Sequence, residues 1–279
     1  MNQSRKPRNL IKTLIIKALR ICAIAYTTLF IGFYFFQKKM IFVPSKDVSS
    51  TPKSIGLDYQ THIVGKDKVY SWYIPSKKEH ADTVLICHGN AGNISDRLST
   101  ISFYHNALEL NLVIFDYSGY GNTPGTVGEE ATYNNSRDVF DFMVSDLKID
   151  PNHIIVDGRS LGGAVAVDLA VNRKFKALII QSTFTSIYDM ARKQVPFFPI
   201  SWLQKVYYDS ISKVGQVECP TLVIHSKEDQ IIPFEMGETL YGKLKSPKQF
   251  CTISGGHNSG WQESIEVYTK AIQKLLKTF

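Results

Sequence analysis

The sequence predicts an α/β fold built on a mostly parallel, doubly wound sheet. Short, continuous apolar runs alternate along the chain with segments of helical periodicity, which is typical of strands that crossover helices bury on both faces. One of these runs leads into Ser160 at a glycine-flanked turn, and a helix-forming segment follows. These observations together indicate the fold and place a candidate site at one edge of the sheet.

Eight runs are the expected strands. The first two, 59–64 and 68–74, should form a hairpin around Gly65-Lys66-Asp67, because polar turn residues separate them. The other six are mostly continuous apolar runs, at 83–87, 112–115, 154–163 with the serine turn included, 177–180, 221–225 and 249–253. Helices are expected from residue 96, over 129–146, after the serine turn, and over 261–279.

The positive charge of the chain is confined to its N-terminus. The whole sequence carries a net charge of +7, yet residues 1–46 hold nine Lys and Arg and no acidic residue. Residues 47–279 therefore hold the other 23 basic residues against all 25 acidic ones, which leaves them near −2. A basic groove on the main body is not supported, so nucleic acid is not an expected partner.

The N-terminal arm is predicted to anchor the protein in a membrane as a single helix. An uncharged run from Ile21 to Phe36 lies between Arg20 and Lys38. As a helix, its 16 residues span about 24 Å of the ~30 Å hydrocarbon core, and basic side chains at its ends can snorkel. A cleaved signal peptide is disfavoured because no small-x-small site follows, and a surface helix is the other alternative.

The charges around this helix bear on its orientation. The basic N-terminal flank favours the cytosol, so the main body is expected on the non-cytosolic side, in the periplasm or the ER lumen. Lys38 and Lys39 on the other flank oppose this orientation. The expected layout is a basic N-terminus and anchor over 1–43, a linker over 44–57 and one globular domain over 58–279.

The turn at Ser160 has the features of a nucleophile site. In Gly158-Arg159-Ser160-Leu161-Gly162, the two glycines let a strand end and a helix start pass close together. A serine at the apex of such a turn stands out above the sheet, at a helix N-terminus that favours negative charge. The strand before it and the helix after it make the pattern specific.

An acid and a histidine follow in the loops where such a serine needs them. Asp229 lies just after the strand 221–225, with Glu228 next to it as a rival acid. His257 follows the last strand and two glycines, which leave its loop room to move. A serine hydroxyl needs a base and a group that orients the base, and the order Ser, Asp, His is that of a known catalytic arrangement.

Three motifs together resemble a known family. They are His88-Gly89-Asn90-Ala91-Gly92-Asn93, Phe115-Asp116-Tyr117-Ser118-Gly119-Tyr120-Gly121 and the turn Gly158-Arg159-Ser160-Leu161-Gly162-Gly163. Over residues 58–279 the chain resembles the α/β-hydrolase superfamily, and within it the membrane-anchored bud-emergence-suppressor-type hydrolases. The resemblance implies an α/β-hydrolase fold, with an oxyanion hole formed by the backbone N–H groups of Asn90 and Leu161. It also implies that His88 braces its loop.

The resulting expectation is a serine hydrolase without a cofactor or metal. Ser160, Asp229 and His257 would cleave acyl esters or thioesters of small or lipid-like substrates through an acyl-enzyme. A serine peptidase of the same fold and a non-catalytic membrane scaffold remain as alternatives. No HExxH or other metal motif appears, and the four cysteines lack CxxC spacing.

The connection before the strand 221–225 is unusually long and rich in aromatic residues. This stretch, about 183–215, lies where the superfamily inserts a cap, and Pro196-Phe197-Phe198-Pro199 breaks any single helix through it. We therefore expect a small apolar cap over Ser160, with Phe197 and Trp202 lining the substrate pocket. The alternative is that these residues only cover the sheet.

Overall fold

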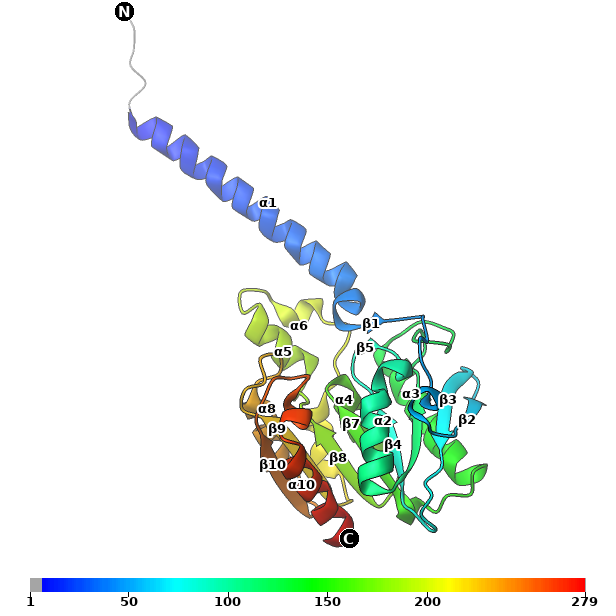
Figure 1. Cartoon of the computed structure of the whole chain (residues 1–279). Coiled ribbons are helices and arrows are strands. Elements are labelled where there is room, and N and C mark those ends of the chain that lie inside the picture. The colour runs from blue at the N-terminus through cyan, green and yellow to red at the C-terminus, as the bar shows by residue number, and fades with distance from the viewer. Residues whose placement is uncertain (1–6, 279) are drawn as a thin grey trace, which may run out of the picture.

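The fold is a twisted eight-stranded sheet between two layers of helices, with one long helix projecting from it (Figure 1). This computed structural model describes residues 7–278, with side chains from residue 10 onward. The strand order is β10-β9-β8-β7-β4-β6-β3-β2, and the hairpin strand β3 runs opposite to the other seven strands. The strands are β2 (Gln60–Val64), β3 (Val69–Ile74), β4 (Thr83–Cys87), β6 (Asn111–Phe115), β7 (Ile154–Arg159), β8 (Ala177–Gln181), β9 (Thr221–Ser226) and β10 (Lys248–Ile253).

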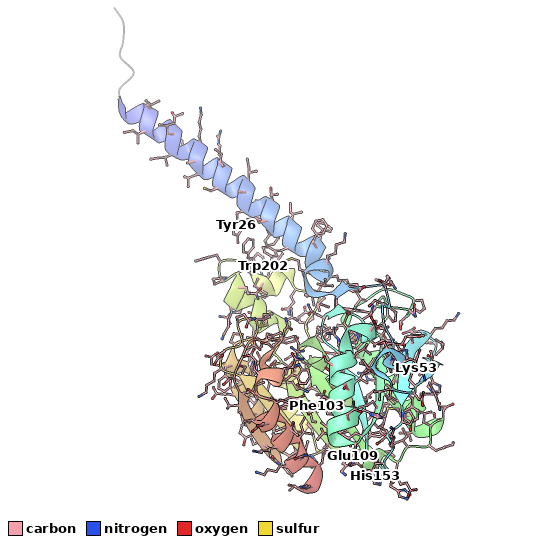
Figure 2. The ribbon with its side chains drawn as sticks, in the orientation of Figure 1. Tyr26, Lys53, Phe103, Glu109, His153 and Trp202 are labelled. Carbon is pink, nitrogen blue, oxygen red and sulfur yellow. The ribbon has the colours of Figure 1, made fainter. Side chains whose placement is uncertain are left out.

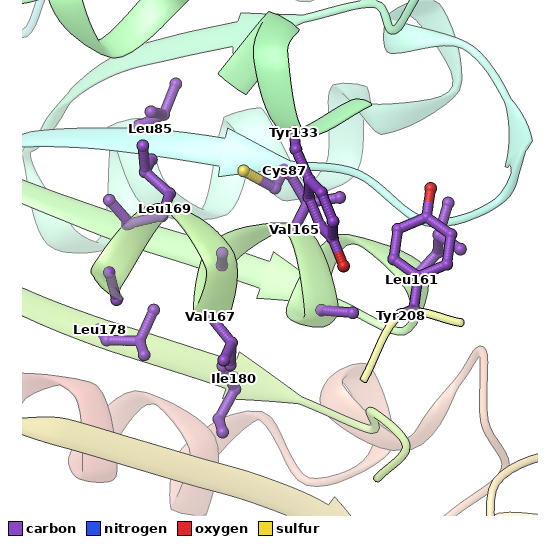
Figure 3. Close-up of a cluster of buried hydrophobic side chains, with 14 of the residues drawn as sticks. Leu85, Cys87, Tyr133, Leu161, Val165, Val167, Leu169, Leu178, Ile180 and Tyr208 are labelled. Atoms are coloured by element: carbon purple, nitrogen blue, oxygen red, sulfur yellow. The ribbon is translucent and has the colours of Figure 1, made fainter. Parts of the chain in front are cut away.

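Alternate residues of the central strands face opposite layers of the core. In β4, for example, Leu85 packs into one buried cluster and Ile86 into the other. Helices α3 (Glu129–Ser145), α4 (Leu161–Asn172) and α8 (Phe234–Lys243) cover the first face. Figure 3 shows part of that cluster, where Leu169 of α4 lies near Leu85 of β4 and Val167 of α4 lies near Ile180 of β8. Helices α2 (Leu98–Ser102) and α10 (Ile265–Thr278) cover the second face.

The predicted fold class is confirmed. Seven of the predicted runs agree with the observed strands to within one residue at each end, and the strand within the run 154–163 ends at Arg159, where the serine turn begins. Two helices differ from expectation. The helix expected from residue 96 begins as the 3-10 turn η2 (Ile94–Arg97) and ends in a π-helical turn (η3, Phe103–Ala107). The C-terminal helix is split into α9 (Gly260–Glu263) and α10, because Ser264 interrupts the helical backbone between them.

Helix α1 (Pro7–Ile41) is 35 residues long and extends away from the sheet, as Figure 1 shows. Its stretch Leu10–Ile41 is long and apolar enough to cross a membrane, and its most apolar window is not buried against the protein. The N-terminal helix therefore fits a single-pass membrane anchor.

The segment expected as a linker, 44–57, is held against the globular domain. Strand β1 (Val43–Pro44) pairs in parallel with β5 (Ala91–Gly92). The side-chain amide of Asn93 donates hydrogen bonds to the carbonyl oxygens of Ser45 and Asp47. The anchor is thus joined to the domain through a paired and hydrogen-bonded segment.

The long connection between β8 and β9 contains short helices, the first two of which lie at the same end of the sheet as α1 (Figure 1). They are α5 (Ile187–Gln194), α6 (Ile200–Leu203), α7 (Ser210–Lys213) and the 3-10 turn η5 (Val214–Gln216). We call residues 183–209 the cap segment.

Candidate active site

Ser160 lies at the apex of a strained turn between β7 and α4. Its backbone φ is 55° and ψ is −120°, a conformation that a non-glycine residue adopts only where the surrounding structure enforces it. The N–H of Ser160 donates to the carbonyl of Gln181, and the hydroxyl of Thr183 donates to the carbonyl of Ser160. These bonds to the segment after β8 hold the turn.

Two glycines make the turn possible by close packing. A Cβ on Gly162 would lie 1.9 Å from the carbonyl oxygen of Cys87, at the end of β4. A Cβ on Gly158 would lie 2.3 Å from the carbonyl oxygen of Gly162. No side chain fits at either position, so the start of α4 can sit directly on the strand ends.

The structure brings the predicted serine, histidine and aspartate together. Nε2 of His257 lies 3.2 Å from Oγ of Ser160, and Nδ1 of His257 lies 2.7 Å from Oδ2 of Asp229. Sheet register explains the meeting, because Ser226 of β9 is paired with Ile253 of β10 and the loops after both strands therefore start side by side. The side chain of Asp229 is fully buried.

The carboxylate of Asp229 is surrounded by donors. Its Oδ1 accepts hydrogen bonds from the N–H groups of Ile231 and Ile232, and its Oδ2 lies 3.5 Å from Nε2 of His225. Burial raises the pKa of this carboxyl, but hydrogen bonds from His225, His257 and Ile232 outweigh burial and hold the pKa below its usual range. Asp229 is therefore ionised and can stabilise a protonated His257.

Glu228, the rival acid in the sequence, has a different position. Its carboxylate accepts a hydrogen bond from the N–H of Gly255, and its own N–H donates to the hydroxyl of Ser226. These bonds brace the loop that carries His257, while the carboxylate that contacts the imidazole is that of Asp229.

The loop after β4 passes beside Ser160. Cys87 is paired with Gly158 in the sheet, so the next residues of both strands emerge together, and a Cβ on Gly89 would lie 3.7 Å from Cβ of Ser160. The backbone N–H groups of Asn90 and Leu161 donate to no acceptor within residues 7–278, which leaves both donors free. These are the two amides that the family resemblance predicts for an oxyanion hole.

Asn90 and His88 are fixed by their neighbours. The carbonyl of Asn90 accepts from the hydroxyl of Tyr120 and from the N–H of Val43, and its side-chain amide donates to the carbonyl of Ile41. Burial, and next the charge of Arg97, lower the pKa of His88 to about 3. His88 is therefore a neutral, buried residue, as the loop-bracing role requires.

A cavity of about 550 Å³ opens onto Ser160 and His257. Much of its apolar wall comes from two segments far apart in the sequence, the cap segment and the end of α1. The cap contributes Phe184, Ile187, Met190, Val195, Ile200 and Leu203, and α1 contributes Phe33, Met40 and Ile41 together with the polar Gln37. We call this cavity the pocket.

Phe197 and Trp202, which were expected to line the pocket, lie elsewhere. Their side chains are 88% and 79% exposed, and neither contacts the pocket. The expectation is corrected for a simple reason: the cap does supply apolar side chains to the pocket, but from α5 and from the buried side of α6. Phe197 and Trp202 occupy the outer side of the same short turns.

Sequence reasoning missed three contributors to the site. His225 ends the predicted strand 221–225, and its position four residues before Asp229 could have suggested a contact with that carboxylate. Arg159 lies next to Ser160 and donates hydrogen bonds to the carbonyl of His257 and to Oδ1 of Asn258, so it fixes the histidine loop. The wall from α1 had no signal in the sequence, where that segment is typical only of an anchor.

Comparison with known proteins agrees with the geometry. The model of the prolyl oligopeptidase family matches residues 129–259, which include Ser160, Asp229 and His257. The α/β hydrolase domain-containing protein WAV2 of Arabidopsis thaliana is 29% identical over 272 residues, with 88% of each chain covered. Protein bem46 of Schizosaccharomyces pombe is 28% identical over 251 residues, with 84% of each chain covered.

A solved structure shares the fold. The esterase Pf2001 of Pyrococcus furiosus aligns with a TM-score of 0.71 at 17% identity, over 85% of this chain and 99% of that one. From the sheet order, the serine turn and these matches, the chain belongs to the α/β-hydrolase superfamily, in which it is related to the bem46-like proteins.

Proposed function

We propose that the protein is a membrane-anchored serine hydrolase that cleaves acyl esters or thioesters through an acyl-enzyme intermediate. The observation that carries this proposal is the continuous chain of contacts from Oγ of Ser160 through the imidazole of His257 to the buried carboxylate of Asp229. A serine hydroxyl needs such a base and such an orienting group to act as a nucleophile.

The reaction follows from these positions. Nε2 of His257 takes the proton of Ser160 as Oγ attacks the acyl carbonyl, and Asp229 stabilises the imidazolium that forms. The same proton then passes from His257 to the leaving alcohol or thiol, and the acyl group remains on Oγ. Water, deprotonated by His257, attacks the acyl-enzyme, and the return of the proton to Ser160 releases the acid.

The free amides of Asn90 and Leu161 are proposed to bind the oxyanion of both tetrahedral intermediates. In enzymes of this kind, removal of one such donor lowers kcat by roughly 10²–10³. The turn at Ser160 supports this role, because it places Leu161 at the first position of α4, where a backbone N–H has no acceptor within the helix.

The lining of the pocket favours an ester over a peptide with a free amino terminus. Asp157 is the one carboxylate among the described residues that line it, and Gln181 already donates a hydrogen bond to that carboxylate. Arg97 and Arg159 also line the pocket, and neither is paired with a carboxylate within residues 10–278. Two guanidinium groups would repel a substrate ammonium, so neutral or anionic acyl substrates fit better.

A peptidase activity is the second candidate, because the matched family model is that of the prolyl oligopeptidases. A non-catalytic scaffold is the third.

We further propose that α1 crosses the membrane once and that the hydrolase domain lies on the non-cytosolic side, as the basic N-terminal flank favours.

The test is a substrate panel on the full chain in detergent: p-nitrophenyl esters, acyl-CoAs and aminoacyl amides. Turnover of esters or thioesters, together with labelling of the protein by a fluorophosphonate, is expected for the wild type. Ser160→Ala should abolish both, and Ser145→Ala, at an exposed position at the end of α3, should change neither. Equal labelling of Ser160→Ala would refute the assignment, and turnover of amides alone would favour the peptidase.

A further inference from the structure

The cap segment is packed against the membrane helix along several turns of α1. The ring of Phe198 stacks on Tyr26 with a centroid distance of 4.9 Å and meets the edge of Phe33 at 5.2 Å. The hydroxyl of Tyr26 donates a hydrogen bond to the carbonyl of Phe197. Figure 2 labels Tyr26 on α1 and Trp202 on the cap segment at this junction.

These contacts lie along the part of α1 that can occupy the hydrocarbon core of the membrane. The uncharged part of α1 runs from Ile21 to Phe36, between Arg20 and Lys38, and this is the part that can occupy the hydrocarbon core. Tyr26 and Phe33 both lie within it. A cap residue that contacts Tyr26 therefore lies beside a part of the helix that is itself in lipid.

Polar contacts between the cap segment and α1 begin at the end of this uncharged part of the helix. The side chain of Gln37 donates a hydrogen bond to the carbonyl of Leu203 and accepts one from the N–H of Lys205. The ammonium of Lys205 lies 3.6 Å from the centroid of the Tyr34 ring. Lysine and tyrosine at the end of an apolar span are typical of the membrane–water interface. Gln37 follows Tyr26 by eleven positions in the helix, which is about 16 Å along the axis.

We define residues 195–203 as the cap tip. Phe197 and Trp202 project from it with 88% and 79% of their surfaces exposed, which in water would leave two large apolar side chains uncovered. The carbonyl of Phe197 accepts a hydrogen bond from the hydroxyl of Tyr26. A backbone carbonyl in lipid needs such a donor from the protein, because no water is present to supply one. Continuity with α1 and this satisfied carbonyl point to lipid as the occupant of the exposed surface.

We infer that the cap tip is a second membrane-contacting element, inserted through Phe197 and Trp202 into the leaflet beside α1. The pocket then has a lipid-facing side, because Phe33 lines it from within the uncharged run and Ser160 lines it from the sheet. On the proposed hydrolase function, on which this second step rests, the substrate is an acyl chain of a membrane lipid that enters between α1 and the cap.

Contact with lipid can be measured without any assumption about activity. The full chain is reconstituted in nanodiscs of phosphatidylcholine brominated in mid-chain, with unbrominated lipid as the reference, and tryptophan emission is recorded. Trp72 is fully buried and Trp261 half-buried, so the difference between wild type and Trp202→Phe reports on Trp202. We expect bromine to quench most of the Trp202 emission.

The matched control moves the tryptophan away from the cap. Ile63 is 60% exposed on β2, which is an edge strand of the sheet. A protein with both Trp202→Phe and Ile63→Trp therefore carries its exposed tryptophan on the globular domain, and bromine should not quench the emission of that tryptophan. Equal quenching at both positions, or no quenching of Trp202, would overturn the inference. The inference would also be overturned if Trp202 were protected from bromine quenching to a degree that rises with protein concentration, since a second copy of the protein would then cover the cap tip.

The substrate step needs a separate measurement. Phe197→Ser combined with Trp202→Ser should lower hydrolysis of a long-chain ester held in vesicles by about tenfold or more, while hydrolysis of soluble p-nitrophenyl butyrate stays within about twofold. Equal loss on both substrates, or on neither, would overturn the lipid-entry step. If the wild type hydrolyses neither ester, it is the proposed function that fails, and the quenching result still decides the membrane contact.

Discussion

His225 and Asp229 form a buried pair in which Nε2 of the imidazole lies 3.5 Å from Oδ2 of the carboxylate. The same ring nitrogen lies 3.0 Å from the carbonyl oxygen of Ile232, so it carries the proton and faces two acceptors. The candidate site thus contains two histidines around one carboxylate oxygen. Only His257 reaches Ser160, and His225 acts through Asp229.

The first prediction concerns this second histidine. His225→Phe keeps an aromatic ring but removes the donor, and a hydrogen bond to a charged group contributes about 1.5–3 kcal/mol. We expect kcat to fall by about 10- to 100-fold with KM nearly unchanged, because His225 does not line the pocket. His225→Gln, which retains an N–H donor, should recover part of the loss. A rise in KM without a change in kcat would contradict a positioning role.

The second prediction concerns the segment between anchor and domain. A chain that begins at Thr51 lacks Val43 and Ile41, both of which hydrogen-bond to Asn90. We expect it to be released from membranes but to lose about tenfold or more in kcat on a soluble ester, since the loop that carries Asn90 is no longer fixed. A chain that begins at Gln37 keeps these bonds and is the control. Equal activity of the two chains would show that this segment does not support the site.

The third prediction concerns the glycine after the serine turn. Gly162→Ala places a Cβ against the carbonyl groups of Cys87 and His88, which are backbone atoms that cannot move aside. We expect a loss of about 3 kcal/mol in the free energy of unfolding, as for severe overpacking. Gly242→Ala is the matched control, because open space surrounds that position near the end of α8 and alanine should stabilise by up to about 1 kcal/mol. Thermal unfolding of both variants measures the contrast.

The fourth prediction concerns pH and Asp116. Burial raises the pKa of this fully buried carboxyl to about 7, whereas in the unfolded chain it titrates near 3.9. The folded state therefore binds the proton more tightly. The stability that this proton contributes is fully present below about pH 4 and is lost as the pH rises through about 7.

Asp116→Asn should remove this dependence while keeping an oxygen that accepts the hydrogen bond from the N–H of Ile94. From pH 5 to pH 8 we expect the wild type to lose about 2.5 kcal/mol relative to the variant, or roughly 5–10 °C in Tm. Identical pH profiles of Tm for the two proteins would contradict the raised pKa.

The sequence alone determined the strand runs, the turn at Ser160 and the loops that carry Asp229 and His257. These features are local: apolar periodicity sets the strands, and two glycines set the turn within a few residues. The sheet topology then follows, because alternating strands and helices allow few arrangements.

Only the tertiary structure decided which neighbouring acid contacts the imidazole. Glu228 and Asp229 are adjacent in the chain, and the path of one loop directs one carboxylate to His257 and the other to the N–H of Gly255. Tertiary structure also decided that Phe33 of the anchor lines the pocket and that Phe197 and Trp202 face away from it. The contact of α1 with the pocket joins segments more than 100 residues apart, and periodicity within one segment carries no information about which distant surface will cover it.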